Sequence, residues 1–127
     1  MTDDKNKKRI LFVDDDPAIL AGLRNVFQRD RDRWDLVFAQ GGDRALEELG
    51  RSAFDVVVSD MKMPDMDGVT FLERVRAGWP HTARLMLSGS ATEAEIRGAT
   101  DAVDELLSKP CDTATLRATL ERMMRDR

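Results

Sequence analysis

Short apolar runs alternate along the chain with longer stretches of mixed polar and apolar character. Each run holds four to six residues, is rich in Val, Leu, Ile or Phe, and is followed by polar residues. This length and composition are typical of buried parallel strands. We therefore predict five strands, of which the last is the weakest because two acidic residues interrupt it: Arg9–Val13, Trp34–Ala39, Asp55–Ser59, Arg84–Leu87 and Val103–Leu107.

The stretches that follow the five runs predict one helix each. Their apolar residues recur at intervals of three and four, as on the buried face of an amphipathic helix. Three of these helices begin with a capping signal: Asp16 before Pro17, Asp67, and the capping box Thr92-x-x-Glu95. We expect the second helix to end at Gly50, and the fourth to be marginally stable because it contains Gly98.

Strict alternation of strands and helices predicts an α/β fold with a parallel sheet that helices cover on both faces. Right-handed crossovers place the helices on the two sides in such a doubly wound sheet. Ligands bind these sheets at the carboxyl ends of the strands, where the strand order reverses. The residues directly after each apolar run are therefore the candidate functional residues.

Those positions carry acids, a hydroxyl and a lysine. The second run is followed by Gln40 and two glycines, with no candidate ligand among them. The other four runs supply the candidate set: Asp14, Asp15 and Asp16; Asp60; Ser88 and Gly89; Lys109 and Pro110.

Asp14, Asp15 and Asp60 would repel one another if they met at one edge of the sheet. A hard divalent cation relieves that repulsion, and Mg²⁺ prefers oxygen ligands such as carboxylates together with a phosphate. Such a site suits phosphoryl transfer, with a carboxylate as the nucleophile that forms an aspartyl phosphate. Asp60 is the best candidate for this role, because a central strand places it between the acidic pair and Lys109.

Composition and charge narrow the class of protein. The 127 residues are enough for one domain with a real core. A single Cys makes neither an internal disulfide nor a cysteine-based zinc site, which favours a reducing, cytoplasmic setting. The chain has no apolar run long enough to cross a membrane. The net charge of −4 argues against direct binding of nucleic acid. We expect the arginine-rich stretch Arg29–Arg33 to be a solvated helix end and loop.

Four segments resemble the response-regulator receiver domains of two-component signalling: ILFVDDDPAIL, FDVVVSDMKMPDMDG, RLMLSG and LLSKP. The resemblance covers nearly the whole chain. It implies a flavodoxin-like sheet with strand order 2-1-3-4-5, and a single receiver domain over residues 1–127 with an N-terminal tail at residues 1–8. It further implies a phosphoprotein, not an enzyme acting on other molecules, whose Asp60 accepts phosphate from a sensor histidine kinase or a phosphotransfer protein.

The resemblance also assigns roles to individual positions. Mg²⁺ would be held by Asp14, Asp15, Asp60 and the backbone carbonyl of Lys62. The phosphoryl group would be bound by Ser88, Gly89 and Lys109. The Lys109–Pro110 peptide bond would be cis.

One position departs from the family pattern. Leu106 stands where the family usually has a switch Tyr or Phe, and the chain contains no Tyr. Switching is therefore expected to act through the loop after the fourth strand and the helix that follows it. The face formed by the fourth helix, fifth strand and fifth helix would contact an effector or form a homodimer.

Three alternatives stay open from the sequence. A haloacid-dehalogenase-like phosphatase also uses a strand-end Asp, Mg²⁺, a hydroxyl and a lysine, and Asp14-x-Asp16 matches half of its opening motif. The chain could also be a phosphorylation-independent adaptor with a receiver fold, which Leu106 permits. Finally, it could be cut from a longer regulator, and RLMLSG and SKPC look similar to receivers joined to HD-GYP or HDOD-type output domains.

Overall fold

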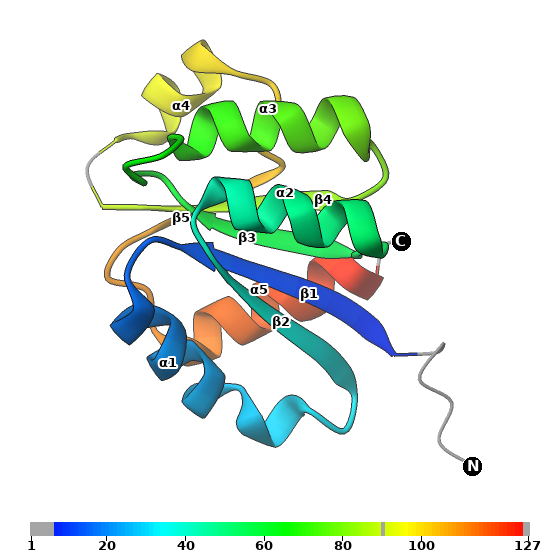
Figure 1. The fold of residues 1–127 in the computed structure, drawn as a ribbon. Helices are drawn as coiled ribbons and strands as arrows, with labels where there is room; N and C mark the ends of the chain where they lie inside the picture. The colour runs from blue at the N-terminus through cyan, green and yellow to red at the C-terminus, as the bar shows by residue number, and fades with distance from the viewer. Residues whose placement is uncertain (1–6, 90, 126–127) are drawn as a thin grey trace.

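The computed structural model describes residues 7–89 and 91–125, which form one parallel sheet between two layers of helices (Figure 1). The sheet has five strands in the order β2-β1-β3-β4-β5, so the predicted fold class and strand order are confirmed. Its strands are β1 (Lys8–Asp14), β2 (Trp34–Gln40), β3 (Val56–Asp60), β4 (Ala83–Ser88) and β5 (Glu105–Ser108). The helices are α1 (Pro17–Val26), α2 (Gly42–Arg51), α3 (Gly68–Gly78), α4 (Glu93–Ala99) and α5 (Thr113–Arg125), with a short 3₁₀ turn at Gln28–Asp30.

Successive side chains of the central strands enter two separate cores, because neighbouring residues of a strand point to opposite faces. On one face, Leu11 and Val57 pack with α2, α3 and α4; on the other, Phe12 and Val58 pack with α1 and α5. Figure 1 shows the same division, with α1 and α5 together on one side of the sheet. The inner strands are buried on both faces and are therefore almost continuously apolar.

The predicted capping signals all form. Asp16 accepts a hydrogen bond from the Ala18 N–H, and Asp67 accepts one from the Thr70 N–H. Thr92 and Glu95 make the reciprocal capping box at the start of α4. These caps fix where α1, α3 and α4 begin, and therefore the lengths of the loops that follow β1, β3 and β4.

Several element boundaries differ from the prediction. α2 continues through Gly50 to Arg51, because Gly50 lies in open space and keeps a negative φ. β1 begins at Lys8, so this residue belongs to the sheet and not to the expected tail; residues 1–6 of that tail lie outside the described residues.

The last strand is also displaced, from the predicted Val103–Leu107 to Glu105–Ser108. Val103 is fully buried, but its carbonyl accepts a hydrogen bond from the Arg97 guanidinium. The carbonyl of the neighbouring Ala102 accepts a 2.7 Å hydrogen bond from Nε of the buried Arg84. Arginine side chains therefore bond to the two backbone carbonyls that precede Asp104, whose own N–H bonds to the Arg84 carbonyl of β4.

The stretch Arg29–Arg33 is not simply solvated. Asp30 is buried and pairs with Arg33 at 2.9 Å and with Arg117 of α5 at 3.1 Å. The guanidinium of Arg33 also stacks on Trp34, 3.9 Å from the ring centroid. This network fastens α5 to the 3₁₀ turn.

Of the described helices, none is long and apolar enough to cross a membrane.

Candidate functional site

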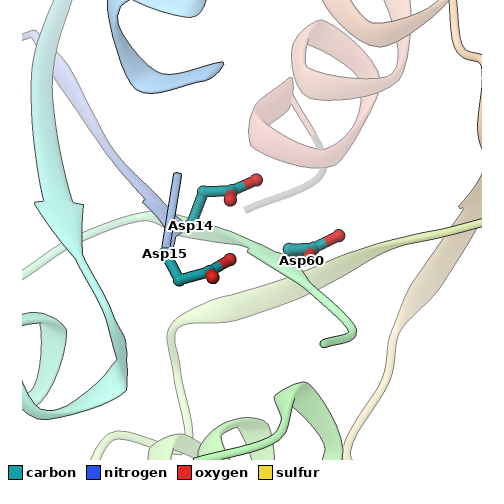
Figure 2. A group of neighbouring side chains, drawn as sticks. All are labelled: Asp14, Asp15 and Asp60. Carbon is teal, nitrogen blue, oxygen red and sulfur yellow. The ribbon is translucent and has the colours of Figure 1, made fainter. Parts of the chain in front are cut away.

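Two adjacent strands bring the three acids together. β1 and β3 pair in parallel with Val13 opposite Ser59, so Asp14 and Asp60 are the next residues on neighbouring strands. Each of Asp14, Asp15 and Asp60 offers a carboxylate oxygen, and these oxygens all lie within 4.8 Å of one another. Figure 2 shows the side chains of Asp14 and Asp15 extending from the end of β1 toward the side on which Asp60 lies.

The environment of Asp14 disfavours its negative charge. Burial raises the pKa of this carboxyl above its ordinary value, and repulsion from Asp60 and Asp15 raises it further. The hydrogen bond from the Asp16 N–H, 3.0 Å long, and the charge of Lys109 act in the opposite direction without cancelling the effect. All the ligand atoms of the cluster are oxygens, and a bound divalent cation would remove the repulsion. The donor set and its charge therefore fit Mg²⁺.

Lys109 lies directly beside Asp60. Its ammonium forms an ion pair with the Asp60 carboxylate, and both side chains are only partly exposed. A pocket of about 200 Å³ opens beside this pair, lined by Asp60, Met61, Lys62, Gly89 and Lys109. The Lys109–Pro110 peptide bond is cis, the isomer that the resemblance implied. The carboxylate of Asp60 is therefore reachable from solvent and flanked by one cation.

Ser88 lies at the end of β4, and its side chain is buried. Its hydroxyl accepts a hydrogen bond from the Ala91 N–H at 3.1 Å and lies 3.4 Å from the sulfur of Met61. The hydroxyl thus contacts both the residue after Asp60 and the loop that leads to α4. Gly89 follows it at an exposed position, where a Cβ would lie 3.8 Å from the Cβ of Lys109.

Leu106 is half-buried and packs against the core beneath α3 and α4. It lies opposite Met86 in the pairing of β4 with β5. The position where the family usually has an aromatic ring is therefore filled by an aliphatic side chain that already contacts the core.

The loop after Asp60 returns sharply to the sheet at Gly68. A Cβ at this position would lie 2.4 Å from the Asp60 carbonyl oxygen and 2.9 Å from the Cα of Met61. The Gly68 N–H also donates a 2.7 Å hydrogen bond to the Met61 carbonyl. The first residue of α3 thus packs directly on the backbone of the candidate nucleophile, which only glycine allows.

The structure brings the predicted residues from β1, β3, β4 and β5 to one edge of the sheet. The contribution of β2 was not predicted from the sequence, because Gln40 and two glycines gave no candidate ligand. The Gly41 N–H donates to the Asp14 carbonyl at 3.0 Å, and the Gln40 side chain donates to the Asp15 carbonyl at 3.2 Å. The available signal was the pair of adjacent glycines directly after a strand, which indicates close approach of another backbone.

Known proteins resemble the chain over most of its length. It is 34% identical over 117 residues to the transcriptional activator protein PfeR of Pseudomonas aeruginosa and 30% identical over 118 residues to the transcriptional regulatory protein TrcR of Mycobacterium tuberculosis. These matches cover 92% of this chain but only 38% and 45% of the two relatives, so the chain spans less than half of their length.

Solved structures agree with this relation. The signal receiver domain of an HD domain-containing protein from Pseudomonas fluorescens Pf-5 superposes with a TM-score of 0.86 and 30% identity, covering 94% of this chain and 96% of that one. The chemotaxis protein CheY4 of Vibrio cholerae has a TM-score of 0.82 and 28% identity, covering 92% and 98%. The profile of the response regulator receiver domain matches residues 10–121, and the chain therefore belongs to the response regulator receiver domain family.

Proposed function

We propose that this receiver domain is a phosphoacceptor whose nucleophile is Asp60. The observation that carries the proposal is the position of this carboxylate, at a solvent-open pocket between Lys109 and the acidic pair at the end of β1. A central strand presents Asp60 at the edge where doubly wound sheets bind their ligands.

Mg²⁺ would be held by the carboxylates of Asp14, Asp15 and Asp60 and by the backbone carbonyl of Lys62. When bound, it neutralises charge on the phosphoryl oxygens and offsets the repulsion within the acidic cluster. The raised pKa of Asp14 supports the proposal, because burial and then the neighbouring acids disfavour a charge that a bound cation would stabilise.

The phosphodonor would be the phosphohistidine of a sensor kinase or a phosphotransfer protein. An Asp60 oxygen attacks phosphorus in line, the phosphorus–nitrogen bond breaks, and its electron pair returns to the imidazole. The Lys109 ammonium pairs with the incoming phosphoryl oxygens, and the Ser88 hydroxyl donates to one of them. Attack of water on the phosphorus of the acyl phosphate later releases phosphate and restores Asp60. The domain thus promotes only its own phosphorylation and dephosphorylation.

Output would depend on the contacts of Ser88. In this structure its hydroxyl is engaged by the Ala91 N–H, so a move toward a phosphoryl group has to break that hydrogen bond and pull on the loop before α4. Leu106 leaves no ring to rearrange, and the change would be transmitted mainly through this loop to the surface of α4, β5 and α5. That surface would bind an effector or a second copy of the chain.

Both named relatives are transcriptional regulators that extend well beyond the matched region. We therefore propose that this domain controls an output domain or a separate effector protein, and that DNA contacts, where a pathway requires them, belong to that effector.

Acetyl phosphate with Mg²⁺ tests the nucleophile. Mass spectrometry should show one added phosphoryl group on the wild type and on Asp101→Asn, which alters an exposed carboxylate. Asp60→Asn should show none, because an amide oxygen is a poor nucleophile and forms no stable acyl phosphate. Full labelling of Asp60→Asn would overturn the assignment, and many turnovers on a phosphomonoester would favour a phosphatase.

A further inference from the structure

The turn between β2 and α2 carries none of the proposed ligands, yet it is hydrogen-bonded to the segment that supplies two of them. The Gly41 N–H donates to the carbonyl of Asp14 at 3.0 Å. The side-chain amide of Gln40 donates to the carbonyl of Asp15 at 3.2 Å. The end of β2 is therefore bonded to the backbone of both Asp14 and Asp15.

The same turn is held from the opposite side by Asp65, which belongs to the loop between β3 and α3. Its carboxylate accepts hydrogen bonds from the N–H groups of Asp43, at 3.0 Å, and Gly42, at 3.4 Å. These N–H groups belong to the first turn of α2 and have no acceptor within the helix, and the N-cap Gly41 has no side chain that could accept from them. Asp65 thus supplies from another loop the cap that α2 lacks.

Close contact between the loop and the turn depends on two glycines. Gly41 has φ of 90°, and a Cβ there would lie 3.2 Å from a carboxylate oxygen of Asp65. A Cβ on Gly42 would lie 3.2 Å from the sulfur of Met66. The backbone of the turn is therefore shaped to receive Asp65 and Met66.

The loop between β3 and α3 is consequently fixed at two points. Its base is closed by Gly68, which packs on Asp60 and bonds to the Met61 carbonyl at 2.7 Å. Its tip is fastened to α2 by Asp65. Lys62 is exposed and lies between these two anchors.

We propose that Asp65 is a positioning residue for the metal site, a role that rests on the proposed function. By fastening the loop to the turn that also bonds Asp14 and Asp15, it fixes the Lys62 carbonyl relative to the carboxylates. Mg²⁺ requires near-ideal octahedral geometry, so a ligand on an unfastened loop contributes less binding free energy. Residues that orient metal ligands typically change metal affinity by about 10–100-fold when mutated.

Mg²⁺ affinity, measured by following amide resonances during titration with MgCl₂, tests the proposal. Asp65→Ala removes both acceptors and should weaken Mg²⁺ binding by about tenfold, at the lower end of that range because Asp65 acts through a backbone. Asp65→Asn keeps an acceptor for the Asp43 N–H and should stay within about threefold of the wild type. Asp43→Asn removes an equal charge from the same turn without touching the bond, and should bind Mg²⁺ like the wild type.

A measurement without metal separates positioning from general destabilisation. Asp65→Ala should accelerate amide hydrogen exchange in residues 61–66 of the metal-free protein. Asp112→Ala, which removes a capping acceptor for the Thr115 N–H of α5, should leave those amides unchanged. Equal Mg²⁺ affinity of Asp65→Ala and the wild type would overturn the inference, as would an equal loss in Asp43→Asn. A wild type that binds no Mg²⁺ would instead refute the proposed function.

Discussion

Replacing Asp14 by Asn should stabilise the metal-free protein at neutral pH. The carboxylate oxygens of Asp14, Asp15 and Asp60 lie within 4.8 Å of one another. Two full charges at that separation repel by about 0.9 kcal/mol in bulk water and about 3.5 kcal/mol at an effective dielectric constant of 20. Asn has nearly the same volume and keeps an oxygen for the Asp16 N–H, 3.0 Å away. Because attraction to Lys109 is lost as well, we expect a net gain of about 1 kcal/mol in the free energy of unfolding.

The gain should depend on pH in a defined direction. Burial, with repulsion from its two neighbours, raises the pKa of folded Asp14 above the unfolded value. The free energy of unfolding therefore falls as the pH rises through the folded pKa and Asp14 ionises in the folded protein. Below the unfolded pKa, Asp14 is neutral in both states and the wild type and Asp14→Asn should be equally stable. The advantage of the variant should grow above that pH and become constant once folded Asp14 is fully ionised.

Urea unfolding and calorimetry in EDTA, over a series from about pH 4 to pH 8, measure this difference. A gain of about 1 kcal/mol corresponds to a rise in Tm of roughly 3–5 °C for a domain of this size. Asp101→Asn, at an exposed position, should show no comparable gain. Mg²⁺ at ten times its Kd adds about 1.4 kcal/mol to the wild type and less to the variant, which lacks a ligand. A variant less stable than the wild type in EDTA at neutral pH would refute the argument from repulsion.

Two further predictions concern the loops beside the site. Gly68→Ala should lower the free energy of unfolding by about 1–3 kcal/mol and reduce labelling by acetyl phosphate, because its Cβ would lie 2.4 Å from the Asp60 carbonyl oxygen. Urea unfolding measures the first effect and mass spectrometry the second. A variant as stable as the wild type would contradict the close contact at Gly68. Beryllofluoride with Mg²⁺, as a phosphoryl mimic, should change amide exchange in residues 91–100, because the Ser88 hydroxyl must release the Ala91 N–H. Unchanged protection there would contradict switching through this loop.

The fold and the clustering of the candidate residues were predictable because both are encoded locally. A strand buried on both faces has to be apolar, and a polar residue directly after it marks where the chain leaves the sheet. Parallel strands then bring these polar residues to one edge, which is how Asp14, Asp60 and Lys109 could be grouped before their distances were known. The capping residues are also local, since each bonds to backbone within its own helix.

The position of the last strand could not be read in this way. Ala102 and Val103 are apolar, and their hydrophobicity correctly predicts that they are buried. Hydrophobicity does not predict which groups bond to the backbone of these residues, and here the guanidinium groups of Arg84 and Arg97 donate to the two carbonyls. Arginines that bond to carbonyls distant in sequence leave no periodic signal. The strand begins at Glu105, after the carbonyls that these arginines bond.

The contribution of the β2–α2 turn was missed for a related reason. Gly41 and Gly42 have no side chains and were therefore not considered as ligands, yet their backbone N–H groups bond to the carbonyl of Asp14 and to the carboxylate of Asp65. Clustered carboxylates repel one another, so segments that carry them separate unless other contacts hold them. The pairing of β1 with β3 holds Asp14 beside Asp60, and the turn adds hydrogen bonds to the carbonyl of Asp14 and to the carboxylate of Asp65 in the loop after β3. The charged residues of the cluster could therefore be predicted from the sequence, whereas the hydrogen bonds of the glycine turn beside them are defined only by the packed structure.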